Sequence, residues 1–155
     1  MKKKFNVALI LCLLLLVTNI IIALASSAES SKGYYTVYGH DYFNYSTINT
    51  GTNYDGSTFV AAVSSAVCDP PGTETAVPTG YLGARSRLYN SSGKMIEETD
   101  YLYNSSPAWV LHSDSARLDS PVSGQAYYSY GITAAYNGNG YTTYSTFKSP
   151  SLNAP

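Results

Sequence analysis

The groups in this chain that could carry covalent chemistry are one thiol and two imidazoles. Beyond residue 25 the only cysteine is Cys68, and the histidines occur in His40-Asp41 and His112-Ser113-Asp114. Either histidine could pair with the thiol as nucleophile and base, or bind a metal with the nearby carboxylates. No Gly-x-Ser-x-Gly, His-Glu-x-x-His or Cys-x-x-Cys motif accompanies them. The sequence therefore favours a structural role for these residues and predicts no catalytic residue.

A second candidate for chemistry is the segment 51–56, GTNYDG, which has the spacing of part of a calcium-binding loop. The first position of that loop would be Gly51 and the twelfth Ala62, and neither offers a side-chain oxygen. The segment is better interpreted as a turn. We therefore predict neither a metal site nor a cofactor.

Tyrosine is the strongest compositional signal, with 16 tyrosines and one tryptophan in 155 residues. The rings could close a core while their hydroxyls reach water. They could also form a stacking platform for sugars, an adhesive surface or a membrane-interface surface. Adjacent residues of a strand point to opposite faces, so Tyr127 and Tyr128 cannot both be buried on one side. We name Trp109, Tyr127 and Tyr128 as candidate binding residues, with the outward-facing ring of the tyrosine pair expected to act.

Residues 1–25 have the composition of a signal peptide. Three lysines precede a run from 7 to 25 that is apolar except for Thr18 and Asn19, and Ala23-Leu24-Ala25 supplies a cleavage pattern of small residues. Ser26-Ser27-Ala28 offers a second cleavage site. The alternative is an uncleaved anchor, because the run is close to the roughly 20 residues that span a bilayer. We expect a secreted, extracellular protein or an N-terminally membrane-anchored one.

Removal of residues 1–25 leaves a chain long enough for one domain with a core of its own. Six basic and ten acidic residues then remain, a formal charge of −4. This balance excludes nucleic acid and anionic membrane surfaces as partners, since both require clustered positive charge. Cys68 alone cannot form an intramolecular disulfide, so stability must come from a β core.

The rest of the sequence alternates short strand patterns with turn signals. The clearest element is a hairpin within 124–150, whose arms meet at Asn137-Gly138-Asn139-Gly140. A second hairpin joins 81–89 to 94–103 across Asn90-Ser91-Ser92-Gly93, and Glu97, Glu98 and Asp100 could pair with Arg85 and Arg87 across it. Strands are also predicted at 33–48, as one kinked strand or two short ones, at 58–67 as a central strand, and at 108–112.

These elements predict an all-β protein, a single antiparallel β-sandwich of about seven strands with a small barrel as the second choice. The sandwich should span 33–150, after a flexible start at 26–32 and before a tail at 151–155. The predicted core residues are Phe59, Val63, Leu88, Ile96, Leu102, Val110 and Ile132.

Several segments carry a resemblance to known proteins: 80–85 (GYLGAR), 87–93 (RLYNSSG), 136–141 (YNGNGY) and Ser149-Pro150. Through them the chain resembles small secreted β-proteins of Gram-positive bacteria, which carry no assigned role. In architecture and composition it is also similar to bacteriocins of the lactococcin 972 type, which are leader-bearing, tyrosine-rich, disulfide-free β-sandwiches. The second resemblance implies an antimicrobial function.

From the sequence we expect a secreted, non-enzymatic interaction protein that acts at the cell envelope or surface through a tyrosine-rich β-sheet face. A cell-wall glycan or a surface protein would be its partner. A secreted bacteriocin-like or toxin-like protein is the alternative hypothesis, and a Cys-dependent enzyme is the third.

Overall fold

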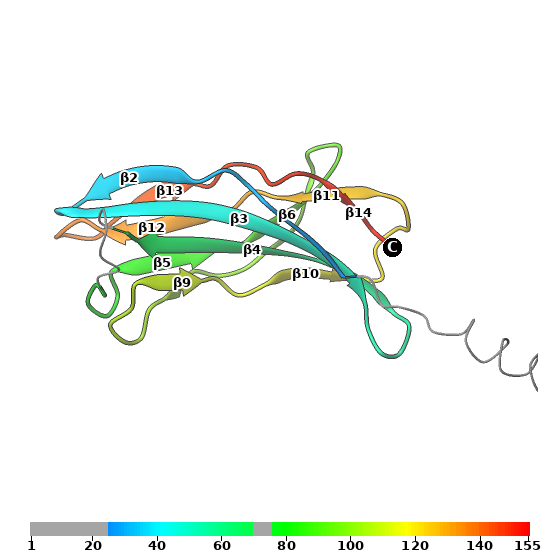
Figure 1. Ribbon diagram of the computed structural model, residues 1–155, viewed down its shortest axis with the longest axis horizontal. Helices are drawn as coiled ribbons and strands as arrows, with labels where there is room; N and C mark the ends of the chain where they lie inside the picture. The colour runs from blue at the N-terminus through cyan, green and yellow to red at the C-terminus, as the bar shows by residue number, and fades with distance from the viewer. Residues whose placement is uncertain (1–24, 70–75) are drawn as a thin grey trace, which may run out of the picture.

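Two long antiparallel strands, β3 (His40–Thr52) and β4 (Thr58–Cys68), form the centre of the first layer and run along its length (Figure 1). Both are rich in the β-branched and small residues that fit a sheet packed on one face and partly covered on the other. Each flank of this six-stranded sheet is an interrupted strand. The flank beside β3 consists of β1 (Ser26–Glu29) and β2 (Gly33–Val37), and the flank beside β4 of β9 (Val110–His112) and β10 (Ala116–Asp119).

The second layer consists of two four-stranded sheets that run end to end. Their strand orders are β13-β12-β5-β8 and β14-β11-β6-β7. Only Ser86 separates β5 from β6, so the strands of one sheet continue into those of the other. The eight strands are β5 (Leu82–Arg85), β6 (Arg87–Asn90), β7 (Met95–Glu98), β8 (Leu102–Tyr103), β11 (Ala126–Ser129), β12 (Ile132–Tyr136), β13 (Tyr141–Ser145) and β14 (Leu152–Asn153).

This computed structural model describes residues 25–69 and 76–155, and all named strand pairs in that part of the chain are antiparallel. The fold is all-β, as predicted, and two layers face each other as in a β-sandwich rather than closing into the barrel that was the second choice. The predicted signal peptide lies outside the described residues except for Ala25. No helix in the described part of the chain is long and apolar enough to cross a membrane.

Both predicted hairpins are confirmed. β12 and β13 pair across the turn 137–140, where Gly138 and Gly140 adopt positive φ angles of 93° and 145°. β6 and β7 pair across a turn in which Gly93 has a φ of 82°. The stretch 33–48 forms two strands rather than one, because Tyr38 and Gly39 both take positive φ and reverse the chain. Glycine tolerates such angles without strain, and this lets the turns close tightly.

The two ends of the domain differ from the expectation. Ser26–Glu29 forms β1 and pairs with β3, where the sequence predicts a flexible start. Leu152–Asn153 forms β14 and pairs with β11, where a tail was predicted. Both segments are short and polar, so their own pattern carries little strand signal. They are ordered because each completes an edge of a sheet.

A belt of buried hydroxyl side chains crosses the middle of the sandwich, at the level where the strands are interrupted. An interruption leaves backbone N–H groups without a ladder partner, and a buried N–H group without a partner is costly. Hydroxyl oxygens fill this role: Ser30 accepts from the N–H of Ser46 at 3.0 Å, and Ser86 accepts from the N–H of Ser64 at 2.9 Å. We call this set the hydroxyl belt, and its members are Ser30, Ser46, Ser64, Ser86, Ser113, Ser129, Thr146 and Ser149.

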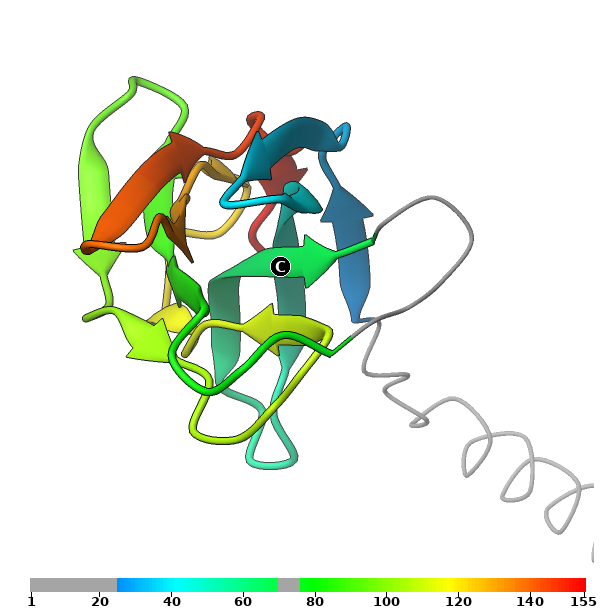
Figure 2. The same ribbon diagram turned by 90° about the vertical axis from the view of Figure 1, so that its left-hand side faces the viewer.

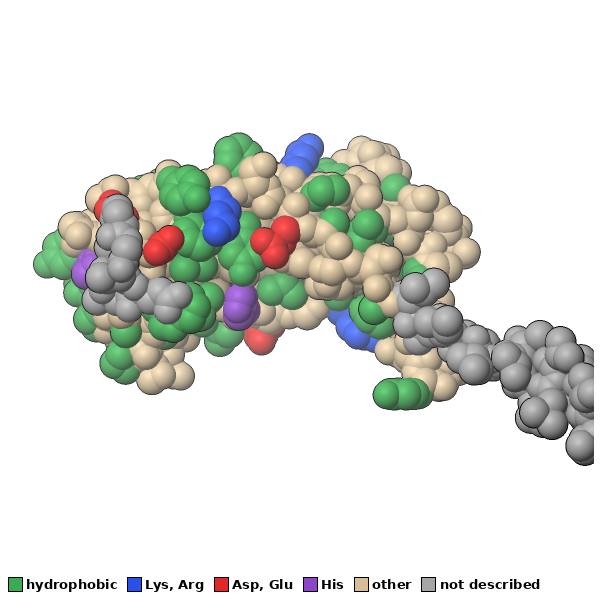
Figure 3. Space-filling view, viewed as in Figure 1, with side chains coloured by type: hydrophobic (Ala, Val, Ile, Leu, Met, Phe, Trp, Pro, Cys, Tyr) green, Lys and Arg blue, Asp and Glu red, His purple; other side chains and the backbone are tan. Residues whose placement is uncertain are grey.

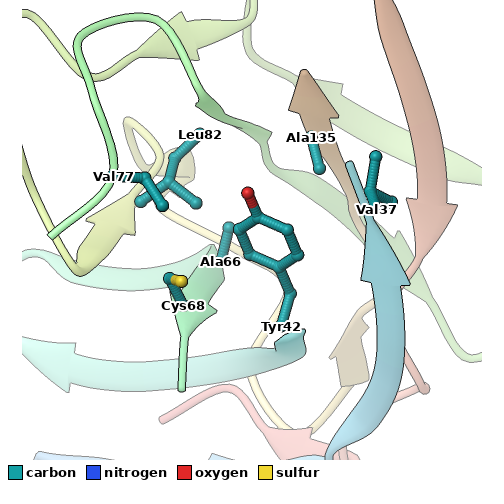
Figure 4. Packing of buried hydrophobic residues seen from close by; sticks show 7 residues of the cluster. All are labelled: Val37, Tyr42, Ala66, Cys68, Val77, Leu82 and Ala135. Carbon is teal, nitrogen blue, oxygen red and sulfur yellow. The ribbon is translucent and has the colours of Figure 1, made fainter. Parts of the chain in front are cut away.

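The hydroxyl belt divides the apolar core into two clusters. The first has the Tyr42 ring at its centre (Figure 4) and contains Val37, Tyr42, Ala66, Cys68, Val77, Leu82 and Ala135. The second contains Ile48, Val60, Ala62, Leu88, Ala116, Tyr127 and Ala154. Each cluster fills one end of the sandwich, so the large apolar side chains lie at the ends and the small polar ones in the middle.

Most of the predicted core residues prove to lie elsewhere. Of the seven, Leu88 is buried and Ile96 packs against the second cluster. Phe59 and Val63 belong to the outward face of β4, because the inward face is formed by Val60, Ala62, Ser64, Ala66 and Cys68. Leu102 is exposed, and Val110 and Ile132 are half-buried outside both clusters. The two faces of β4 are both apolar, so alternation alone could not tell which one points inward.

Candidate functional site

The three residues named from the sequence lie on different parts of the molecule. Tyr127 is 2% exposed and belongs to the second core cluster. Tyr128 faces outward from the second layer, where its ring stacks on Tyr89 at 5.3 Å between centroids and Lys148 lies 5.0 Å from it. Trp109 is 42% exposed and precedes β9 in the first layer. The structure therefore separates Trp109 from Tyr128 and removes Tyr127 from the candidate surface.

The largest array of aromatic rings lies on the outer face of the sheet β13-β12-β5-β8 and continues around the end of the sandwich. Neighbouring rings have centroids between 4.7 and 6.5 Å apart. We call this surface the tyrosine face, and its members are Tyr38, Tyr81, Tyr101, Tyr103, Tyr136 and Tyr141. Figure 2 looks onto the end of the sandwich where the β2–β3 and β12–β13 turns come together.

Strand alternation and cross-strand register build the part of the tyrosine face that lies on the sheet. Tyr103 is opposite Gly83, and Gly83 is opposite Ala134 on the next strand. Tyr136 and Tyr141 face each other where the β12–β13 hairpin closes. Gly83 is essential to the packing, because a β-carbon there would lie 2.6 Å from the Tyr103 ring. The small residues in the centre let the surrounding rings lie flat against the sheet.

The β2–β3 turn brings the most exposed ring of the tyrosine face to the end of the sandwich. Tyr38 is 60% exposed and has a φ of 51°, a left-handed conformation that few residues other than glycine adopt. Its ring lies against Gly138 of the β12–β13 turn, where a β-carbon would lie 2.7 Å from the ring. The Tyr136 hydroxyl donates to the Gly138 carbonyl at 2.9 Å and so fixes the turn against which Tyr38 rests.

The tyrosine face is electrically neutral over most of its area. Partial burial raises the pKa of Tyr103 and of Tyr141, and the neighbouring tyrosines raise both further. These hydroxyls therefore stay protonated at neutral pH and remain hydrogen-bond donors as well as acceptors. Among the described residues, the cation in contact with the tyrosine face is Arg85, which lies 5.1 Å from the Tyr101 ring and also forms an ion pair with Glu98.

The groups considered for covalent chemistry do not assemble. Cys68 points into the first core cluster, whereas His112 lies on the outward face of the same sheet and shares a 2.8 Å hydrogen bond with Ser65. Burial raises the pKa of the Cys68 thiol, and the charges of Asp41 and Asp69 raise it further, which opposes formation of the thiolate. His40 packs against Tyr42 and Tyr81. No group of three metal-ligating side chains occurs within residues 25–69 and 76–155.

The chain matches no protein-family model, no curated protein and no solved structure.

The sequence predicted a tyrosine-rich sheet face but not the six residues that form it, although part of their signal was present. The Tyr136 to Tyr141 spacing across a tight turn requires these rings to lie side by side on one face. Tyr101 and Tyr103 are two residues apart, so in an extended strand their rings point to the same face. Tyr38 and Tyr81 could not have been added from the sequence, because each reaches the surface from a different turn of the folded chain.

Proposed function

We propose that the protein is a secreted, non-enzymatic interaction protein that acts at the cell envelope or surface and binds through the tyrosine face. Its partner is a cell-wall glycan or a surface protein. The observation that carries this proposal is the continuous array of six tyrosine rings, of which Tyr38, Tyr103 and Tyr141 are 60%, 36% and 43% exposed.

Physical reasoning supports a contact role for such a surface. A tyrosine ring offers a large rigid contact area that loses little conformational entropy on binding, and its hydroxyl can hydrogen-bond at the rim. Tyrosine is accordingly enriched among the residues that dominate binding energy in interfaces. A contiguous exposed aromatic patch is also an unusual feature of a protein without a partner.

The position of Ala25 in the fold is compatible with either a secreted or an N-terminally anchored protein. Ala25, the first described residue, adjoins β1, which pairs near the far end of β3 from the β2–β3 turn (Figure 1). The 13 residues of β3 separate these ends by roughly 40 Å. Cleavage after Ala25 leaves β1 whole, whereas cleavage after Ala28 would remove three of its four residues. An anchored form would present the tyrosine face away from the membrane.

The test is a binding assay of the mature protein with purified cell wall and with isolated glycan. Tyr141→Ala and Tyr103→Ala should each weaken binding by about 1–3 kcal/mol, or roughly 5- to 150-fold, as is typical of an aromatic hot spot. Tyr54→Ala is the matched control, because Tyr54 is fully exposed on the β3–β4 turn at the other end of the sandwich. Unchanged binding of both variants would refute the tyrosine face as the site.

A growth-inhibition assay in parallel separates the proposal from the bacteriocin-like alternative. An envelope binder should bind wall material and leave bacteria alive, whereas a toxin should inhibit the growth of neighbouring strains. Trp109→Ala and Tyr128→Ala extend the comparison to the two exposed residues named from the sequence. If only one of these two variants lost binding, the site would lie on the surface around that residue.

A further inference from the structure

A groove on the outer face of the six-stranded sheet forms a second surface, separate from the tyrosine face. Outward side chains of β3, β4 and β9 form its floor, because Phe43 is opposite Val67 of β4, and Val67 is opposite Val110 of β9. Glu29 at the end of β1, Lys32 and Trp109 border it, and its volume is about 230 Å³. Figure 3 shows this face, where charged and histidine side chains stand among hydrophobic ones.

The apolar part of the groove offers flat rings to a ligand. Trp109 is 42% exposed, although large aromatic residues are normally well buried. Tyr45 adds a second, half-buried ring on the same face of β3, whereas Phe43, 6.2 Å from it between centroids, is only 7% exposed and forms the apolar floor. One face of a pyranose ring carries several C–H bonds, and such a face stacks well on an aromatic ring. The rings of the groove therefore fit a ligand with one apolar face and a polar edge.

The polar part of the groove supplies hydrogen-bond donors and acceptors without a net charge. Glu29 and Lys32 carry opposite charges, yet no ion pair joins them within the described residues. The Lys32 ammonium instead lies 4.2 Å from the centroid of the Phe43 ring. Because these charges cancel, the groove favours a neutral ligand that can donate to a carboxylate and accept from an ammonium group. Hydroxyl groups do both.

His112 adds a third polar group, whose orientation is fixed. Its Nδ1 shares the 2.8 Å hydrogen bond with Ser65, and Ser65 is 1% exposed. A ring held through Nδ1 presents Nε2 on its other edge, and the imidazole lines the groove. A hydroxyl group of a ligand can hydrogen-bond to that nitrogen in either tautomer.

From these features we propose that the groove binds one neutral pyranose ring of a glycan, stacked on Trp109 and held at its hydroxyl groups by Glu29, Lys32 and His112. The volume supports a single sugar ring, because pockets for drug-sized ligands measure about 300–1,000 Å³. The groove lies on the opposite layer from the tyrosine face. Sugar binding in the groove is therefore independent of binding at the tyrosine face.

Trp109 provides a direct readout, because it is the only tryptophan in the chain. We would titrate the full mature protein with glucose and with N-acetylglucosamine and follow tryptophan emission. A saturable change with a dissociation constant on the order of 1 mM is expected for so small a ligand. Glycine betaine and sodium acetate, as zwitterionic and anionic probes at equal concentrations, should produce no saturable change.

Variants decide whether the response comes from the groove. Glu29→Gln and Lys32→Met should each raise the dissociation constant at least fivefold, and their thermal unfolding should stay that of the parent because both side chains lie at the surface. Sugar binding to the two Trp109 variants is measured by saturation-transfer NMR, because they lack the tryptophan signal. Trp109→Phe should still bind the sugar, whereas Trp109→Ala should not. Tyr141→Ala should leave the sugar response unchanged, which keeps this test separate from that of the tyrosine face.

Three results would overturn the proposal. These are the absence of a saturable response to either sugar by emission and by NMR, an equal response to betaine or acetate, and unchanged affinity in both the Glu29→Gln and Lys32→Met variants. Loss of sugar binding in Tyr141→Ala with no loss in Glu29→Gln would move the sugar site to the tyrosine face and likewise reject the groove.

Discussion

Gly131 lies directly against Ser64 across the middle of the sandwich, so that a β-carbon at Gly131 would overlap the Ser64 hydroxyl oxygen. The two residues come from different layers, Ser64 from β4 and Gly131 from the interruption between β11 and β12. The same hypothetical carbon would lie 2.7 Å from the Arg85 carbonyl. The layers thus touch at the hydroxyl belt, and only small side chains fit between them.

Gly131→Ala should lower the free energy of unfolding by about 1–3 kcal/mol, the usual cost of overpacking a well-packed interior. The Ser64 hydroxyl has no hydrogen-bond partner among the described residues, so Ser64→Ala alone should be nearly neutral. The double variant should recover about 1 kcal/mol, because the overlap with the hydroxyl oxygen is gone. Urea unfolding of the four proteins measures this coupling. Strict additivity would show that the two residues are not in contact.

Glu98→Gln should lower stability by about 1 kcal/mol, because Glu98 forms ion pairs with both Arg85 and Arg87 at partly exposed positions. The difference should shrink at 1 M salt, where such pairs are screened. Glu97→Gln is the matched control, since Glu97 is exposed and forms no ion pair in the described part of the chain. A salt-independent loss would point to packing rather than charge.

Cys68 should react slowly with a thiol reagent in the folded protein, because its side chain is fully buried and its pKa is raised. Labelling should accelerate by orders of magnitude once urea unfolds the chain, and its rate in the folded state should follow the opening equilibrium. Rapid labelling of the folded protein, lost on substitution of His40 or His112, would revive the Cys-dependent enzyme.

Stability should fall as the pH rises above 10, because burial raises the pKa of Tyr35 to about 12. An unfolded tyrosine ionises near pH 10, so between pH 10 and 12 the folded state holds a proton that the unfolded state has lost. Each such group then costs stability at up to about 1.4 kcal/mol per pH unit. Burial raises the pKa of Tyr42 as well, which steepens the fall.

Tyr35→Phe isolates the contribution of one residue to this pH dependence. The variant should lose about 1 kcal/mol at pH 7, since the Tyr35 hydroxyl lies 3.2 Å from the Thr133 hydroxyl. Its stability should then decline less between pH 10 and 12 than that of the parent. Urea unfolding at pH 7, 10 and 11.5 provides the comparison, and equal declines would contradict the assignment of Tyr35.

The sequence by itself determined the elements whose signals are local. The Asn-Gly-Asn-Gly turn with its flanking alternating aromatic residues predicted the β12–β13 hairpin, and the turn Asn90-Ser91-Ser92-Gly93 predicted the β6–β7 hairpin. The apolar run at 58–67 predicted the central strand β4. The all-β class follows from these patterns together, because each depends only on neighbouring residues. The tyrosine content likewise predicted a tyrosine-rich face, but not its location.

Tertiary structure decided which face of each strand is inside. On β4 the register places Ala62, Ser64 and Ala66 against the second layer and turns Val63 outward, because the layers approach too closely at the hydroxyl belt for large side chains. Phe59 lies on the same outward face of β4 as Val63. The tertiary structure also moved Tyr127 into the core and assembled the tyrosine face from strands and turns that are far apart in sequence. Such choices depend on the spacing between two sheets, and no local pattern encodes that distance.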